Sequence, residues 1–135
     1  MGKNKIVYRV IVPTLILSIA VLYIHFFHLD NGTRVTPIAA ENISSMTVTV
    51  MPEEETIPCD REQIESFAKA YNHARNYRDD YGTTPMAMAK IVFNNGDTLR
   101  VWGGGCDFQG MERDGERHNI RGRALGAWFD GIAAE

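Results

Sequence analysis

A long stretch without charged side chains near the start of the chain constrains the fold more than any other feature. From Val10 to Leu29 there is no Asp, Glu, Lys or Arg. A helix of this length extends about 30 Å, which matches the hydrocarbon thickness of a bilayer. The stretch therefore predicts one transmembrane helix over residues 10–29, in contact with membrane lipid.

Basic residues concentrate on the N-terminal side of this stretch. Lys3, Lys5 and Arg9 precede it, whereas the nearest cation that follows is Arg34. Because cytoplasmic flanks carry the excess of Lys and Arg, we expect the N-terminus in the cytoplasm. The prediction is a single-pass signal-anchor in the cell membrane, with the C-terminal domain outside. Its expected parts are a cytoplasmic tail over 1–9, the anchor over 10–29, a tether over 30–44 and an extracytoplasmic domain over 45–135.

A cleaved signal peptide is the alternative interpretation of the same stretch. Signal peptides have apolar cores of about 7–15 residues that end at a small-x-small site. This stretch is longer and ends in Phe26, Phe27 and His28. The sequence favours the uncleaved anchor.

The rest of the chain is acidic. Residues 35–135 contain ten Lys or Arg against sixteen Asp or Glu, a net charge of −6. Nucleic-acid binding requires a basic surface, so no nucleic-acid partner is predicted. A segment of this length can form one hydrophobic core. Residues 33–44 show neither helical nor strand periodicity, which is why they are assigned to the tether.

Cys59 and Cys106 are the two cysteines of the chain. An oxidising compartment would permit a disulfide between them. In the chain-entropy model such a bond stabilises a domain by about 4 kcal/mol. A Cys59–Cys106 disulfide is the prediction, and two free thiols, one of them reactive, are the alternative.

Hydrophobic periodicity predicts one strand followed by one helix in the first half of the domain. Residues 45–51 alternate, with Met46 and Val48 on one side, as in a half-buried strand. The acidic run 53–55 is expected to be a solvated loop. Asp60 and Gln63 then form a capping-box pattern at a helix start. The apolar stripe of this helix comprises Ile64, Phe67, Ala68, Tyr71 and Ala74.

A β-hairpin is predicted around Asn94-Asn95-Gly96, joining residues 86–93 to 97–103. A two-residue loop would pair Ile91 with Arg100 and mix apolar with charged side chains. A three-residue loop with Gly96 in the left-handed region pairs Ile91 with Leu99 and keeps one face apolar. Because register follows the buried face, the three-residue loop is the prediction.

A second hairpin is predicted to turn at Asp114-Gly115. A two-residue loop places Glu112 opposite Arg117, which is favourable. A last amphipathic helix carries Leu125, Trp128, Phe129 and Ile132 at helical spacing. The predicted fold class is α+β, a small antiparallel sheet with two amphipathic helices covering one face.

Two stretches are candidates for a binding surface. Trp102 is followed by three glycines, Gly103, Gly104 and Gly105, whose backbone could approach a peptide or ligand. The same glycines could instead form a bulge that links two strands. A cluster of basic residues could bind an acidic partner, a carboxylate ligand or lipid head groups, or its neighbouring carboxylates could neutralise it. The cluster comprises Arg113, Arg117, Arg121 and Arg123 with His118.

No catalytic or metal-binding pattern is evident in the sequence. Cys106 with His73 or His118 could form a nucleophile and base, but no family signature surrounds the thiol. His73, His118 and Asp107 lack the spacing of metal ligands. No cofactor and no catalytic residues are predicted. The leading hypothesis is a non-enzymatic binding or accessory module for another envelope or membrane protein. A ligand-sensing domain and a thiol enzyme are the alternatives.

Overall fold

The computed structural model of the chain describes residues 2–23, 32–78 and 84–134. The chain divides into two compact units, Met1–Thr33 and Arg34–Glu135. The first unit contains helix α1, and the second contains a sheet with two long helices.

The helix of the first unit, α1 (Gly2–Tyr23), differs from the predicted anchor. It begins well before residue 10 and includes Lys3, Lys5 and Arg9 in its first turns. Its charge-free part within the described residues, 10–23, would extend only about 21 Å, against about 30 Å of hydrocarbon. The rest of the predicted anchor, residues 24–29, lies outside the described residues.

Among the described residues, no helix has both the length and the apolar character needed to cross a membrane. The prediction of a transmembrane helix over 10–29 is therefore wrong. The prediction of a single-pass signal-anchor depended on that helix and is wrong for the same reason.

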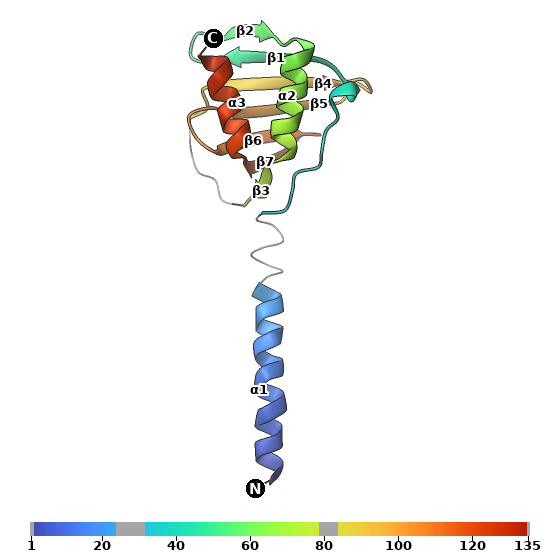
Figure 1. The fold of residues 1–135 in the computed structure, drawn as a ribbon, viewed down its shortest axis with the longest axis vertical. Coiled ribbons are helices and arrows are strands. Elements are labelled where there is room, and N and C mark those ends of the chain that lie inside the picture. The colour runs from blue at the N-terminus through green and yellow to red at the C-terminus, as the bar shows by residue number, and fades with distance from the viewer. Residues whose placement is uncertain (1, 24–31, 79–83, 135) are drawn as a thin grey trace. The chain divides into compact units, whose positions relative to one another are not determined.

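The second unit is a two-layer domain of one antiparallel sheet and two helices (Figure 1). Its elements in chain order are η2 (Ala40–Asn42), β1 (Ile43–Val50), β2 (Glu55–Pro58), α2 (Arg61–Asn72), β3 (Arg75–Tyr77), β4 (Ala87–Phe93), β5 (Thr98–Gly103), β6 (Phe108–Arg113), β7 (Glu116–Arg121) and α3 (Arg123–Ala133). The seven strands lie in the order β2-β1-β4-β5-β6-β7-β3. The predicted antiparallel sheet with two amphipathic helices is confirmed.

Both predicted hairpins have the expected register. In the first, Ile91 pairs with Leu99, and the backbone N–H of Phe93 donates to the carbonyl of Asp97 across a three-residue loop. Gly96 has φ +92°, the left-handed conformation that the loop requires. In the second, Glu112 pairs with Arg117 around the two-residue turn. The apolar pattern was sufficient to determine the register because only one register buries a whole face.

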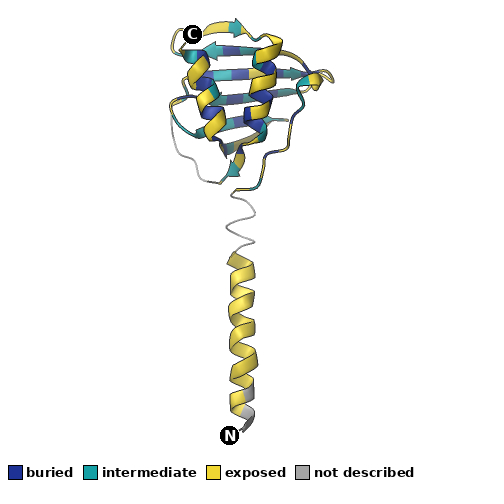
Figure 2. Cartoon of the chain, in the orientation of Figure 1, coloured by how far each residue is buried: buried dark blue, intermediate teal, exposed yellow. Residues whose placement is uncertain are grey.

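Helices α2 and α3 lie side by side on one face of the sheet, and the core lies between the two layers (Figures 1 and 2). Asp60 caps α2 as predicted, with its carboxylate accepting from the backbone N–H of Gln63 at 2.8 Å. Phe67 of α2 packs edge-on against Trp128 of α3, with ring centroids 4.9 Å apart. The predicted apolar stripes of both helices, apart from a half-buried Trp128, are buried in this core.

Two short strands and one packed segment were not predicted from the sequence. Strand β2 includes Glu55 of the run expected to be a loop, and β3 forms where no strand was predicted. Residues 34–39, which we call the strap, belong to the domain although they were assigned to a tether. Ile38 of the strap is buried, and its backbone N–H and carbonyl both bond the Asn72 side chain at 2.8 Å.

Gly103 is required for the contact between β5 and α3. A Cβ at this position would lie 2.6 Å from Cδ2 of Phe129, closer than carbon atoms can approach. We expect Gly103→Ala to lower the free energy of unfolding by about 1–3 kcal/mol, as overpacking does. Urea unfolding followed by circular dichroism measures this loss.

Gly131→Ala is the matched control, because a Cβ at Gly131 has no neighbour within 4 Å. Gly131 lies inside α3, where Ala is favoured over Gly by up to about 1 kcal/mol. This variant should be slightly more stable than the natural chain. Equal stability of the two variants would contradict the packing role of Gly103.

Candidate functional site

The sheet has a second face, turned away from α2 and α3, which we call the outer face. Side chains alternate along each strand, so the residues between the buried core positions point to this face. The cross-strand pairs Met88–Trp102, Trp102–Gly110 and Gly110–Asn119 form one row across β4, β5, β6 and β7. The outer-face residues with aromatic or charged side chains are Arg75, Tyr77, Lys90, Arg100, Trp102, Phe108, Glu112, Arg117 and Arg121.

Trp102 and Arg117 meet across Gly110. Trp102 is half-buried on β5, directly opposite Gly110 on β6. A Cβ at Gly110 would lie 3.7 Å from Cε3 of Trp102, so the indole lies over this residue. The Arg117 guanidinium lies 5.1 Å from the Trp102 ring centroid. A cation at this distance from an indole face is attracted by the ring quadrupole.

A second aromatic and basic contact follows on β6, β7 and β3. The guanidinium of Arg121 lies 5.4 Å from the ring centroid of Phe108. The Tyr77 ring is tilted against the same Phe108 ring, with centroids 5.0 Å apart. Phe108 and Tyr77 are half-buried, and Arg121 is exposed. Aromatic faces and guanidinium groups therefore alternate along one half of the outer face.

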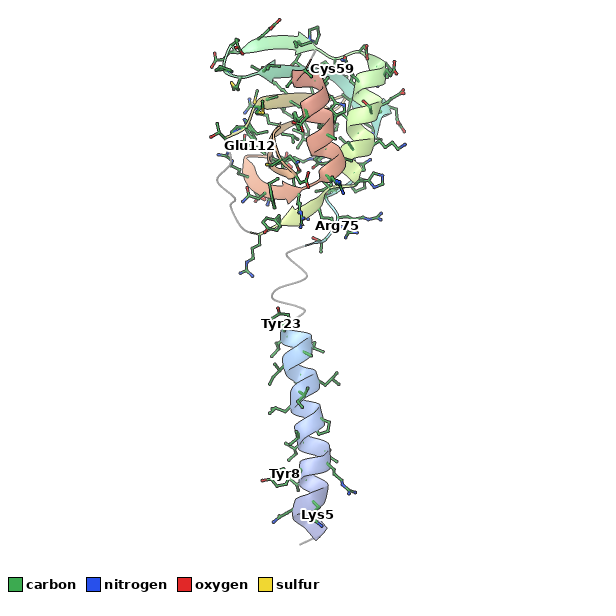
Figure 3. All side chains as sticks on the ribbon, turned by 60° about the vertical axis from the view of Figure 1, so that its left-hand side comes forward. Lys5, Tyr8, Tyr23, Cys59, Arg75 and Glu112 are labelled. Atoms are coloured by element: carbon green, nitrogen blue, oxygen red, sulfur yellow. The ribbon has the colours of Figure 1, made fainter. Side chains whose placement is uncertain are left out.

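The outer face is basic although the domain is acidic. It carries Lys90, Arg100, Arg117, Arg121 and Arg75, against a single described carboxylate, Glu112. Glu112 lies 3.5 Å from Arg100, as an oxygen-to-nitrogen distance, and both side chains are partly exposed. Figure 3 labels Glu112 on the sheet and Arg75 at the end of the domain where β3 lies. The described acidic residues are thus mostly on the helices, turns and loops.

The structure brings together only part of the predicted binding surface. Trp102, Arg117 and Arg121 lie on the outer face. Gly103 faces Phe129 in the core, and Arg123 is the exposed first residue of α3. Since residues two or four apart on a strand share a face, the sequence could have placed Arg117 and Arg121 on one face of a strand.

The glycine-rich stretch forms the connection between β5 and β6. Gly104 has φ +110° and packs on Met86, whose Cβ lies 2.8 Å from where a Cβ of residue 104 would be. The backbone N–H of Gly105 donates to the Asp130 carboxylate of α3 at 2.8 Å. These contacts hold the connection against the helix layer, away from the outer face.

Sequence reasoning did not identify Tyr77, Phe108 and Gly110 as part of a site. The alternation along residues 108–112 was the available signal, because Phe108, Gly110 and Glu112 share one face of β6. The contribution of Tyr77 depends on the pairing of β3 with β7, which is distant in sequence.

Cys59 and Cys106 are both free thiols, so the predicted disulfide is wrong. The backbone N–H of Cys59 bonds Met46 of β1, whereas Cys106 lies between β5 and β6. Strand β4 lies between β1 and β5, and strands are spaced about 4.8 Å apart, whereas disulfide Cα atoms lie within about 7 Å. The fold therefore keeps the two cysteines apart. Figure 3 labels Cys59 at the end of the domain opposite Arg75.

The two thiols have different surroundings. Burial and the neighbouring Asp60 carboxylate raise the pKa of the Cys59 thiol from 9.0 to about 11. The thiol of Cys106 donates to the Phe108 carbonyl oxygen at 3.5 Å. Among the described residues, no group of three or more His, Cys, Asp or Glu side chains could hold a metal ion.

Comparison with known proteins shows the fold. No family model matches the chain, and no curated protein matches it. A solved structure described as "Crystal Structure of Putative Lipoprotein from Clostridium perfringens" is similar, with a TM-score of 0.51 and 12% sequence identity. The match covers 70% of this chain and 87% of the other. At this identity the similarity establishes a shared fold.

The raised pKa of Cys59 predicts slow alkylation. At pH 7.4 a thiol of pKa about 11 has about 100-fold less thiolate than one of pKa 9.0, and the thiolate is the nucleophile. In a Cys106→Ser variant, the rate of alkylation of Cys59 by iodoacetamide should rise tenfold per pH unit from pH 7 to 10. Mass spectrometry of timed samples measures the rate.

The Cys59→Ser variant, which retains Cys106, serves as the comparison. The natural chain, denatured without reductant, should titrate as two free thiols per chain with Ellman's reagent. A plateau of the Cys59 rate near pH 8.5 would contradict the effect of burial on this thiol.

Proposed function

We propose that the chain is an envelope-associated accessory protein that binds, through its outer face, an acidic surface of a protein partner. The similar solved structure is described as a lipoprotein of Clostridium perfringens, and lipoproteins are envelope proteins. That description concerns the other protein and supports only the location that we propose here. The outer face supports the binding role.

The observation that carries the proposal is the arrangement of Trp102, Phe108, Arg117 and Arg121 on one side of the sheet. Tryptophan, tyrosine and arginine are the residues that most often dominate binding energy in protein interfaces. The rings supply apolar area, and the guanidinium groups are positioned above them. Cations on this face, with one described carboxylate among them, favour an acidic partner surface.

Binding is better supported than thiol catalysis. A catalytic cysteine requires a lowered pKa, whereas the pKa of Cys59 is raised to about 11. Cys106 packs at the β5–β6 connection, where its carbonyl oxygen would lie 2.5 Å from a Cβ at Gly126. Among the described residues, the Cys106 thiol hydrogen-bonds the Phe108 carbonyl oxygen and neither His73 nor His118, the bases that a thiol enzyme would require.

A photo-crosslinking experiment in host cells tests the proposal. A photoreactive phenylalanine analogue replaces Lys90, which is exposed and belongs to the outer face. The natural surface should yield a discrete protein adduct. In the Arg117→Glu/Arg121→Glu variant the adduct should fall at least 100-fold, because like-charge contacts cost several kcal/mol and about 1.4 kcal/mol is tenfold.

Arg123→Glu is the matched charge reversal, since Arg123 is exposed on α3 in the helix layer. It should leave the adduct unchanged. Circular dichroism should show all variants folded, because exposed cation–π contacts contribute only about 0.5–1 kcal/mol. An adduct that persists in the double variant would contradict the proposal. Binding of the purified protein to a DNA oligonucleotide as strongly as to the protein partner would contradict it as well.

A further inference from the structure

Arg113 lies on the opposite face of the sheet from Arg117 and Arg121. It is the last residue of β6 and pairs with Leu99, whose side chain is buried in the core. Arg113 is itself half-buried, and its guanidinium lies 5.2 Å from the Phe93 ring centroid. Among the described residues, no carboxylate lies within ion-pair distance of it. A half-buried cation without an ion pair is the kind of group that a bound anion stabilises.

A pocket of about 300 Å³ opens beside Arg113. Pro37 and Ile38 of the strap and Phe93 form its apolar walls, and Asn42 and Asn94 contribute amide groups. Arg113 is the one charged residue among the described residues that line it. This volume is at the lower limit for small-molecule sites, which combine apolar walls with a few polar groups.

The walls of this pocket are held in place by hydrogen bonds. The strap is fixed by the two bonds between Ile38 and the Asn72 side chain. The backbone N–H of Asn94 donates to the Asn42 carbonyl at 2.8 Å, and its side-chain amide donates to the Glu41 carbonyl at 2.9 Å. The pocket is therefore preformed, which lowers the entropic cost of binding.

A second pocket, of about 210 Å³, also contains Arg113 in its lining. It is lined by Asp114 and Glu116 as well, and Glu116 lies 3.5 Å from His118. These carboxylates disfavour an anion on that side. An anionic group would accordingly bind Arg113 from the first pocket, next to the apolar walls.

We propose that the pocket between the strap and the β4–β5 turn binds a small carboxylate that carries an apolar group. The carboxylate pairs with the forked donors of Arg113, whose guanidinium lies over the Phe93 ring. The apolar group lies against Pro37 and Ile38. This site is independent of the outer face and would make the domain a ligand-binding one. A free acid and the carboxyl terminus of a peptide share this chemistry.

The test is an NMR titration of the ¹⁵N-labelled full-length chain with N-acetyl-L-leucine and with N-acetyl-L-leucinamide. The acid should give saturable shifts at the amides of Ile38, Phe93 and Asn94, and the leucinamide should give none. Equal shifts with the two compounds, or no shifts with either, would overturn the proposal. This comparison uses the natural chain and does not depend on any variant folding.

Variants assign the effect to Arg113. Arg113→Gln should weaken binding of the acid at least tenfold, while Arg123→Gln should bind as the natural chain does. Unchanged affinity in Arg113→Gln would overturn the assignment. Acetyl-Ala-Ala-Leu distinguishes the two sources of the carboxylate. If it binds more tightly than N-acetyl-L-leucine, the carboxylate is that of a chain terminus. If it binds equally or more weakly, the carboxylate is that of a free acid. Both results support a carboxylate site.

Discussion

The packing of α2 and α3 against one face of the sheet is the interaction on which the rest of the domain depends. Phe67 is at its centre, with its ring against Trp128 and Phe129 of α3 and stacked on Tyr71 of its own helix. Sheet side chains alternate, so every residue that enters this core places its neighbours on the outer face. The side chains of the outer face therefore do not fill the core, and core packing does not determine which residues occur there. The rings and guanidinium groups of the outer face require another explanation, and contact with a partner supplies one.

The parts of the fold that the sequence predicted are those with a local or strongly periodic signal. Asp60 and Gln63 define the start of α2 through contacts three residues apart. The register of the first hairpin follows from burial, because a shift by one residue would expose Ile91 and Leu99. Trp102, Arg117 and Arg121 were also named as candidates from the sequence, and all three lie on the outer face.

The parts that it did not predict depend on distant pairing or on packing. Strand β3 has only three residues, and its partner β7 lies about forty residues further on. The strap has no periodicity because its order comes from Asn72, a side chain on α2. The separation of Cys59 from Cys106 follows from the strand order, which no residue spacing encodes. The charge-free run over 10–29 predicted a membrane-spanning helix from its length, but α1 begins at Gly2 and includes basic residues in its first turns.

The positions of the basic cluster in the fold show why residues close in sequence need not form one site. Arg117 and Arg121 are four residues apart on one strand and therefore share the outer face. Arg113 pairs with Glu116 across the two-residue turn, so it lies on the opposite face with the core positions Leu99 and Met111. Chain reversal at the turn thus divides the cluster between two environments. One set of cations lies over half-buried aromatic rings and suits a broad acidic surface. The other is a single half-buried guanidinium beside an apolar pocket and suits one small anion. A two-layer domain can in this way separate a surface for a protein from a site for a ligand within nine residues of sequence.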